Sequence, residues 1–92
     1  MADEKTSAGV DFTTFVLSLG SSALVHLGDM SHPEAGHTAE NLLLARQTID
    51  ILAMLEEKTR GNLTAEEARF LRDLLADLRL RFVDRSRAAR EA

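Results

Sequence analysis

The sequence contains no cysteine, no tryptophan and no tyrosine, and one proline in 92 residues. The missing cysteines exclude a disulfide scaffold, a thiolate metal site and a cysteine nucleophile. Four phenylalanines are the whole aromatic inventory, so the chain lacks the side chains that usually stack on nucleic-acid bases. The first residues also lack the basic start and apolar run of a secretory signal. We therefore expect a disordered lead over residues 1–10 and a cytoplasmic protein.

What the sequence does contain is typical of one small folded domain. With 45% hydrophobic and 28% charged residues, the chain is neither disordered nor of low complexity. Its apolar residues recur at helical spacing, and turn-forming residues gather in two places only. The pattern predicts an all-α fold of three helices, with a helical domain over 11–84 and a basic, fraying tail over 85–92.

Local signals place the ends of these helices. The first helix is expected from Phe12 to about Leu27, with Asp11 as its N-cap and Gly28 at its end. The second is expected from Thr38 or Ala39 to Thr59 or Arg60, followed by Gly61 in a left-handed conformation. The third begins after Thr64, whose spacing from Glu67 matches a capping box, and runs at least to Asp84. The short link after Gly61 predicts that the last two helices form an antiparallel hairpin on which the first helix docks.

The two predicted helices before Gly61 carry more apolar residues than one buried stripe needs. In the second helix, Leu43 and Met54 fall outside both of its apolar stripes, and in the first helix leucines flank small residues. We expect self-association into a larger helical bundle to cover this surplus. The candidate interface comprises Leu17, Gly20, Ser21, Leu24, Leu43 and Met54. The alternative is that helices one and three cover helix two completely and that the remaining leucines are ordinary surface residues.

Polar residues on the edge of the second helix form a second candidate feature. Arg46, Gln47 and Asp50 lie there, either as a polar network that fixes one packing register or as plain surface.

The formal net charge of −4 is unevenly distributed along the chain, because five arginines follow residue 78. This basic end has three possible partners, namely nucleic acid, an anionic lipid surface or the acidic body of another copy, although cations at a helix C-terminus also simply complement the dipole. The arginines are spread around the helix, which argues against specific nucleic-acid readout.

No residue pattern indicates a chemical activity. His26, His32 and His37 match no standard metal-ligand spacing, and the pair Ser22 and His26 lacks a third orienting group. We therefore expect no catalytic residue, no metal, no cofactor and no enzymatic function.

The uncharged stretch over 12–28 lies at the lower edge of the length of a membrane span, and acidic residues rather than cationic anchors flank it. A membrane span is therefore not expected, while peripheral contact stays open.

Three stretches resemble one known family. They are DFTTFVLSLGSSALVHLG, beginning at Asp11, ARQTIDILAMLEEKT, beginning at Ala45, and the segment from Gly61 to Val83. Together they resemble a family of small bacterial proteins with a domain of unknown function, over roughly residues 11–83. The resemblance implies a stand-alone bacterial cytoplasmic helical domain and assigns no catalytic residue. The function we expect is a non-enzymatic, self-associating interaction or scaffold module. The alternative is a peripheral regulator that contacts a membrane surface or a partner helix through its first helix and arginine-rich tail.

Overall fold

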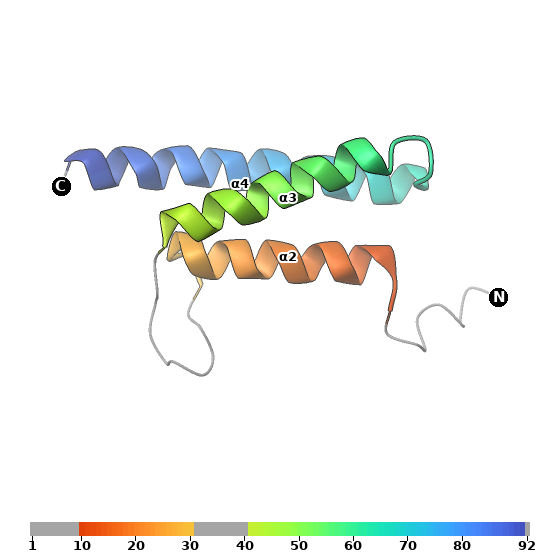
Figure 1. The fold of residues 1–92 in the computed structure, drawn as a ribbon, viewed down its shortest axis with the longest axis horizontal. Coiled ribbons are helices and arrows are strands. Elements are labelled where there is room, and N and C mark those ends of the chain that lie inside the picture. Colours follow the sequence, from red (N-terminus) through yellow and green to blue (C-terminus); the bar gives the residue numbers. More distant parts are fainter. Residues whose placement is uncertain (1–9, 31–40, 92) are drawn as a thin grey trace.

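The computed structural model of the protein describes residues 10–30 and 41–91. Within these ranges the chain forms three helices and no strand, namely α2 (Phe12–Leu27), α3 (Leu42–Lys58) and α4 (Ala65–Glu91). Every helix contacts the other two. In Figure 1, α3 runs obliquely from the C-terminal end of α2 to the N-terminal end of α4. The all-α prediction of a helix docked on a helical hairpin is confirmed. The predicted N-terminal lead lies outside the described residues, apart from the exposed Val10.

Helix α2 has the two ends that its sequence predicts. A carboxylate oxygen of Asp11 accepts a hydrogen bond from the backbone N–H of Thr14 at 2.7 Å, which satisfies one of the free donors at the start of the helix. Gly28 ends the helix with φ 85°, in the left-handed region that costs glycine little. Its N–H donates to the carbonyls of Leu24 and Val25. The predicted bounds are therefore confirmed.

Helix α3 begins later than predicted. Asn41 is its N-cap, accepting a hydrogen bond from the N–H of Leu44 at 3.1 Å, so the start predicted at Thr38 or Ala39 is wrong. The sequence offers several capping residues here, and tertiary contact selects among them. The N–H of Asn41 donates to the carbonyl of His26 at 2.6 Å, which ties the start of α3 to the end of α2.

The link between α3 and α4 follows its local signals closely. Gly61 has φ 89°, and the capping box predicted after it forms in full. The N–H of Glu67 donates to the hydroxyl oxygen of Thr64 at 3.1 Å, and the N–H of Thr64 donates to the Glu67 carboxylate at 2.9 Å. Helix α4 then continues to Glu91, so residues 85–91 are helical where the sequence suggested a fraying tail.

The core lies where the three helices meet. Each helix contributes three apolar residues that are almost fully buried, and the side chains of all nine form one continuous cluster. The buried cluster consists of Val16, Ala23, Leu27, Ala45, Ile49, Leu52, Leu71, Leu75 and Leu78. This cluster fixes which side of each helix remains on the outside, and it therefore positions the surfaces described next.

Candidate functional site

One side of α3 is left uncovered by the rest of the chain. Its inner side is buried, whereas four large apolar side chains on the other side are exposed to solvent. The exposed fractions are 67% for Leu43, 39% for Leu44, 43% for Ile51 and 48% for Met54. We call these four residues, together with the exposed Gln47 between them, the outer face of α3. The alternative in which helices one and three cover this helix completely is therefore wrong for the single chain.

The residues of this face follow a regular spacing. Leu44, Gln47, Ile51 and Met54 are separated by three, four and three residues, the alternation that keeps one seam of a helix facing a partner helix. Scattered surface leucines need no explanation, but a seam of this kind places its side chains in one line. Beneath it, the partly buried hydroxyl of Thr48 donates to the Leu44 carbonyl at 3.0 Å, so the buried polar atom behind the face is satisfied.

Two of the three predicted polar residues, Arg46 and Asp50, lie along one edge of this face, and Gln47 lies within it. Arg46, Gln47 and Asp50 are all exposed, and within the described part of the chain no hydrogen bond joins them. Arg46 and Asp50 line a shallow hollow of about 320 Å³ between α3 and α4. Ile49, Arg79, Phe82 and Val83 complete its lining. The two charges therefore border the outer face of α3 and remain open to a partner.

The predicted interface residues of α2 are placed differently. Gly20 is buried inside the chain, and a Cβ atom at that position would lie 3.0 Å from a methyl group of Leu74. Leu24 is partly buried against the core, Ser21 is half-buried, and Leu17 is 52% exposed. The small residue thus serves close packing of α2 against α4 rather than a leftover surface. Of the six predicted interface residues, the structure brings Leu43 and Met54 together on one exposed face.

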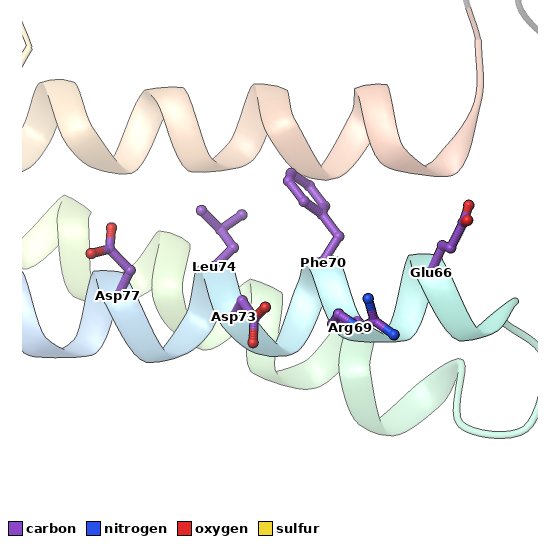
Figure 2. Close-up of a pocket in the computed structure, with 6 residues that line it drawn as sticks. All are labelled: Glu66, Arg69, Phe70, Asp73, Leu74 and Asp77. Atoms are coloured by element: carbon purple, nitrogen blue, oxygen red, sulfur yellow. The ribbon is translucent and has the colours of Figure 1, made fainter.

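A groove of about 430 Å³ runs along the side of α4 that borders α2. Figure 2 shows Phe70 and Leu74 reaching from α4 toward α2, while charged side chains border them. The charged residues are Glu66, Arg69, Asp73 and Asp77.

The described residues include no group of three or more histidine, cysteine or acidic side chains suited to hold a metal ion. His32 and His37 lie outside the described residues.

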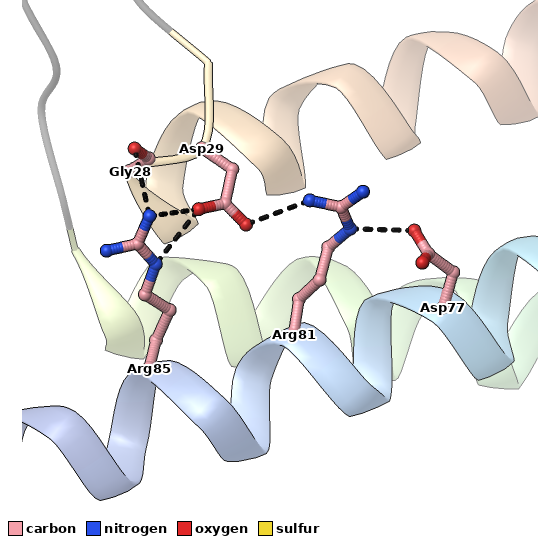
Figure 3. A network of polar contacts seen from close by, with 5 residues as sticks. All are labelled: Gly28, Asp29, Asp77, Arg81 and Arg85. Atoms are coloured by element: carbon pink, nitrogen blue, oxygen red, sulfur yellow. Dashed lines mark hydrogen bonds and ion pairs between the residues drawn. The ribbon is translucent and has the colours of Figure 1, made fainter.

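A charged cluster that the sequence did not predict joins the end of α2 to α4 (Figure 3). The carboxylate of Asp29, whose side chain is 14% exposed, accepts from Arg81 Nη1 at 3.1 Å and from Arg85 Nε at 2.9 Å. Arg85 Nη2 also donates to Asp29 and, at 3.5 Å, to the carbonyl of Gly28. Arg81 Nε donates to Asp77 at 2.8 Å. Two arginines of the predicted basic end thus belong to the packed domain.

The arginines compensate for an unfavourable position of Asp29. A negative charge just beyond the C-terminal end of α2 is repelled by the helix dipole. Burial of the Asp29 carboxylate raises its pKa, but hydrogen bonds from Arg85 and Arg81 and their positive charges outweigh burial and hold the pKa below its ordinary value of 3.8. The hydrogen bond to Asp77, followed by that to Asp29, raises the pKa of Arg81. The cluster therefore stays charged at neutral pH and fastens the end of α2 to α4.

Replacing Asp29 with asparagine is expected to lower the free energy of unfolding by about 1–2 kcal/mol at neutral pH, because charge-assisted hydrogen bonds are lost. The folded-state pKa of Asp29 lies below 3.8, so its contribution is present above that pH and is lost as the pH falls through the folded value. Urea unfolding of both chains should therefore give a constant difference at higher pH that shrinks in acid.

The matched control is Asp73→Asn. Asp73 also faces an arginine, Arg72, at 3.6 Å, but both side chains are about two-thirds exposed (68% and 67%), so its loss should cost little. An equal loss of stability in the two variants, or a difference for Asp29→Asn that persists in acid, would contradict the role of the cluster.

Comparisons with known proteins agree with this description and assign no activity. Within the described residues, no helix has both the length and the hydropathy needed to cross a membrane. A search of curated proteins and a search of solved structures found no match to this chain. A family model described as "Domain of unknown function (DUF1844)" matches residues 9–84, which is most of the chain. The resemblance noted in the sequence thus has its counterpart in a family model, and the chain belongs to the DUF1844 family.

Proposed function

We propose that this protein is a non-enzymatic interaction module that self-associates through the outer face of α3. The observation that carries the proposal is the exposure of Leu43, Leu44, Ile51 and Met54 on one side of a helix whose other side is fixed in the core. A second copy of the same chain offers a matching helix, and closed pairs of identical chains are the commonest soluble assemblies. The three helices would then form part of a larger helical bundle.

An energy comparison indicates how tight such a pair would be. Burying the exposed half of a large apolar side chain is worth roughly 1 kcal/mol, and two copies contribute eight such side chains. The loss of translational and rotational freedom on association costs about 4–15 kcal/mol. The two quantities are similar in size, so we expect a dimer that grows in population with protein concentration rather than one that never dissociates.

Other apolar surfaces offer weaker support for an interaction. Leu80 and Val83 are exposed on α4, at 65% and 47%, but charged residues surround them. On α2, the apolar stripe that a peripheral membrane protein would need packs into the core, with Val16, Ala23 and Leu27 fully buried. Arg81 and Arg85 are also engaged by Asp29 and so are not free to meet anionic lipid. These contacts favour self-association over the membrane alternative.

Substituting Ile51 with aspartate is expected to weaken the dimer at least about tenfold, because a carboxylate would have to be buried in the middle of the interface. Light scattering over a concentration series measures this directly. The unmodified chain should rise from 10.1 kDa toward twice that mass, while the Ile51→Asp variant should stay at 10.1 kDa.

The matched control for this experiment is Leu80→Asp, which places the same carboxylate on an exposed position of α4. This variant should associate like the unmodified chain, and circular dichroism should show the same helix content in all three proteins. A mass of the unmodified chain that stays at 10.1 kDa throughout would refute the proposal. Equal loss of association in the two variants would assign the contact to a different surface.

A further inference from the structure

We infer that the two copies pair their α3 helices antiparallel about a two-fold axis, with Arg46 of each copy facing Asp50 of the other. This inference rests on the proposed self-association and adds its geometry. It starts from the requirement that a two-fold interface be complementary to itself, because the same patch supplies both sides.

Four of the five residues of the outer face are symmetric about the middle of α3, and Leu43 is the exception. Leu44 and Met54 lie five residues to either side of position 49, and Gln47 and Ile51 lie two residues to either side. A two-fold axis perpendicular to the helix at this point places Leu44 of one copy against Met54 of the other at both ends of the contact. Leu44 and Met54 thus meet at each end of the contact, with Ile51 over the aliphatic stem of Gln47 in between.

The bordering charges are symmetric about nearly the same point. Arg46 and Asp50 are one helical turn apart on one edge of α3, both exposed and both lining the same hollow. With the axis at position 49, Arg46 and the Asp50 of the second copy are offset by two residues, about 3 Å along the helix, which an arginine side chain spans. In a parallel pair, by contrast, the two-fold axis places the edges that carry Arg46 and Asp50 on opposite sides of the contact, so these charges do not meet across the interface. Charge complementarity therefore selects the antiparallel arrangement.

The length of α4 favours the same arrangement. Its C-terminal part extends past the beginning of α3 (Figure 1), and it carries the exposed Arg87 and Arg90. A parallel pair would place two such basic ends at the same end of the assembly, where they repel each other. An antiparallel pair places them at opposite ends. It also opposes the dipoles of the two α3 helices, which is the favourable orientation for neighbouring helices.

A charge-exchanged chain tests the geometry. In the double variant Arg46→Asp with Asp50→Arg, the two charges trade places, so an antiparallel pair of identical variant chains keeps both attractive contacts and associates like the unmodified chain. The single variant Arg46→Asp instead creates two carboxylate pairs across the interface. Its dimer should be weaker by about fivefold, as expected for exposed ion pairs.

Mixing the two chains gives the decisive measurement. The double variant is labelled with ¹⁵N, mixed with an equal amount of the unmodified chain, and the three dimer masses are counted by native mass spectrometry. Antiparallel pairing puts like charges together in the mixed dimer, so its share should fall well below one half. Raising the salt to about 1 M should return the share toward one half, because charge interactions are then screened within about 3 Å.

The outcomes separate this inference from the proposal beneath it. A mixed dimer at half or more of the total in low salt overturns the antiparallel geometry, because it would show that Arg46 of one copy does not face Asp50 of the other. If the unmodified chain forms no dimer at all, self-association through this face fails and the inference fails with it. A dimer that Ile51→Asp dissociates and that sorts by charge supports both.

Discussion

Replacing Leu52 with alanine is expected to lower the free energy of unfolding by about 2–5 kcal/mol. Leu52 is fully buried in the middle of α3 and belongs to the cluster shared by all three helices. The change removes apolar contacts and leaves a cavity that rigid neighbouring helices fill only in part. Urea unfolding followed by circular dichroism measures the loss. Low protein concentration is needed, because dimer formation would add to the apparent stability.

The control is the same change at Leu80, where the side chain is 65% exposed. It removes the same atoms from the surface of α4 and should alter the free energy of unfolding by about 0.5 kcal/mol or less. Similar losses at the two positions would show that the cluster around Leu52 is not the core of the domain.

Replacing Gly20 with valine is expected to destabilise the chain by about 1–3 kcal/mol, although glycine is normally a poor helix residue. A Cβ at this position would lie 3.0 and 3.2 Å from the two methyl groups of Leu74, closer than ordinary van der Waals contact. The valine methyl groups would crowd the same place further. The Leu74 side chain or helix α2 would then have to shift, and the buried residues beside them would lose contacts.

Two further variants isolate this contact. Ser18→Val introduces the same side chain at an exposed position of α2 and should cost little, since only helix propensity changes. Leu74→Ala in the Gly20→Val background removes the crowding atoms, so the double variant should be less destabilised than the sum of the two single changes. Strict additivity would mean that the two side chains do not meet.

The parts of the fold that the sequence predicts are those set by neighbouring residues. Asp11, Gly28 and the pair of Thr64 and Glu67 act within a few positions along the chain, so their residue types indicate where α2 ends and α4 begins. The start of α3 is predicted less well. Both Thr38 and Asn41 are suited to cap a helix, and the hydrogen bond that Asn41 makes with His26 in α2 is not visible in local sequence.

The features missed by sequence analysis depend on contacts between distant residues. Asp29 meets Arg81 and Arg85, which are 52 and 56 positions away, and no periodicity indicates which turn of α4 faces the end of α2. Gly20 reads as a surplus small residue until Leu74 is placed against it. For the candidate surface, the excess of apolar residues in α3 is evident from sequence. Its division between a buried and an open side follows only from how the helices pack.

The hydrogen bond from Asn41 to His26 has a consequence for how the chain length can vary. Together with the attachment of Asp29 to α4, it fixes the points at which the chain leaves α2 and enters α3. The entropic cost of closing a flexible chain segment between fixed points grows only with the logarithm of the segment's length. Doubling that length therefore adds about 0.6 kcal/mol to the free-energy cost of closure. A flexible insertion placed between residues 30 and 41 is therefore expected to cost the bundle little. A peptide tag inserted there should leave the arrangement of the three helices unchanged.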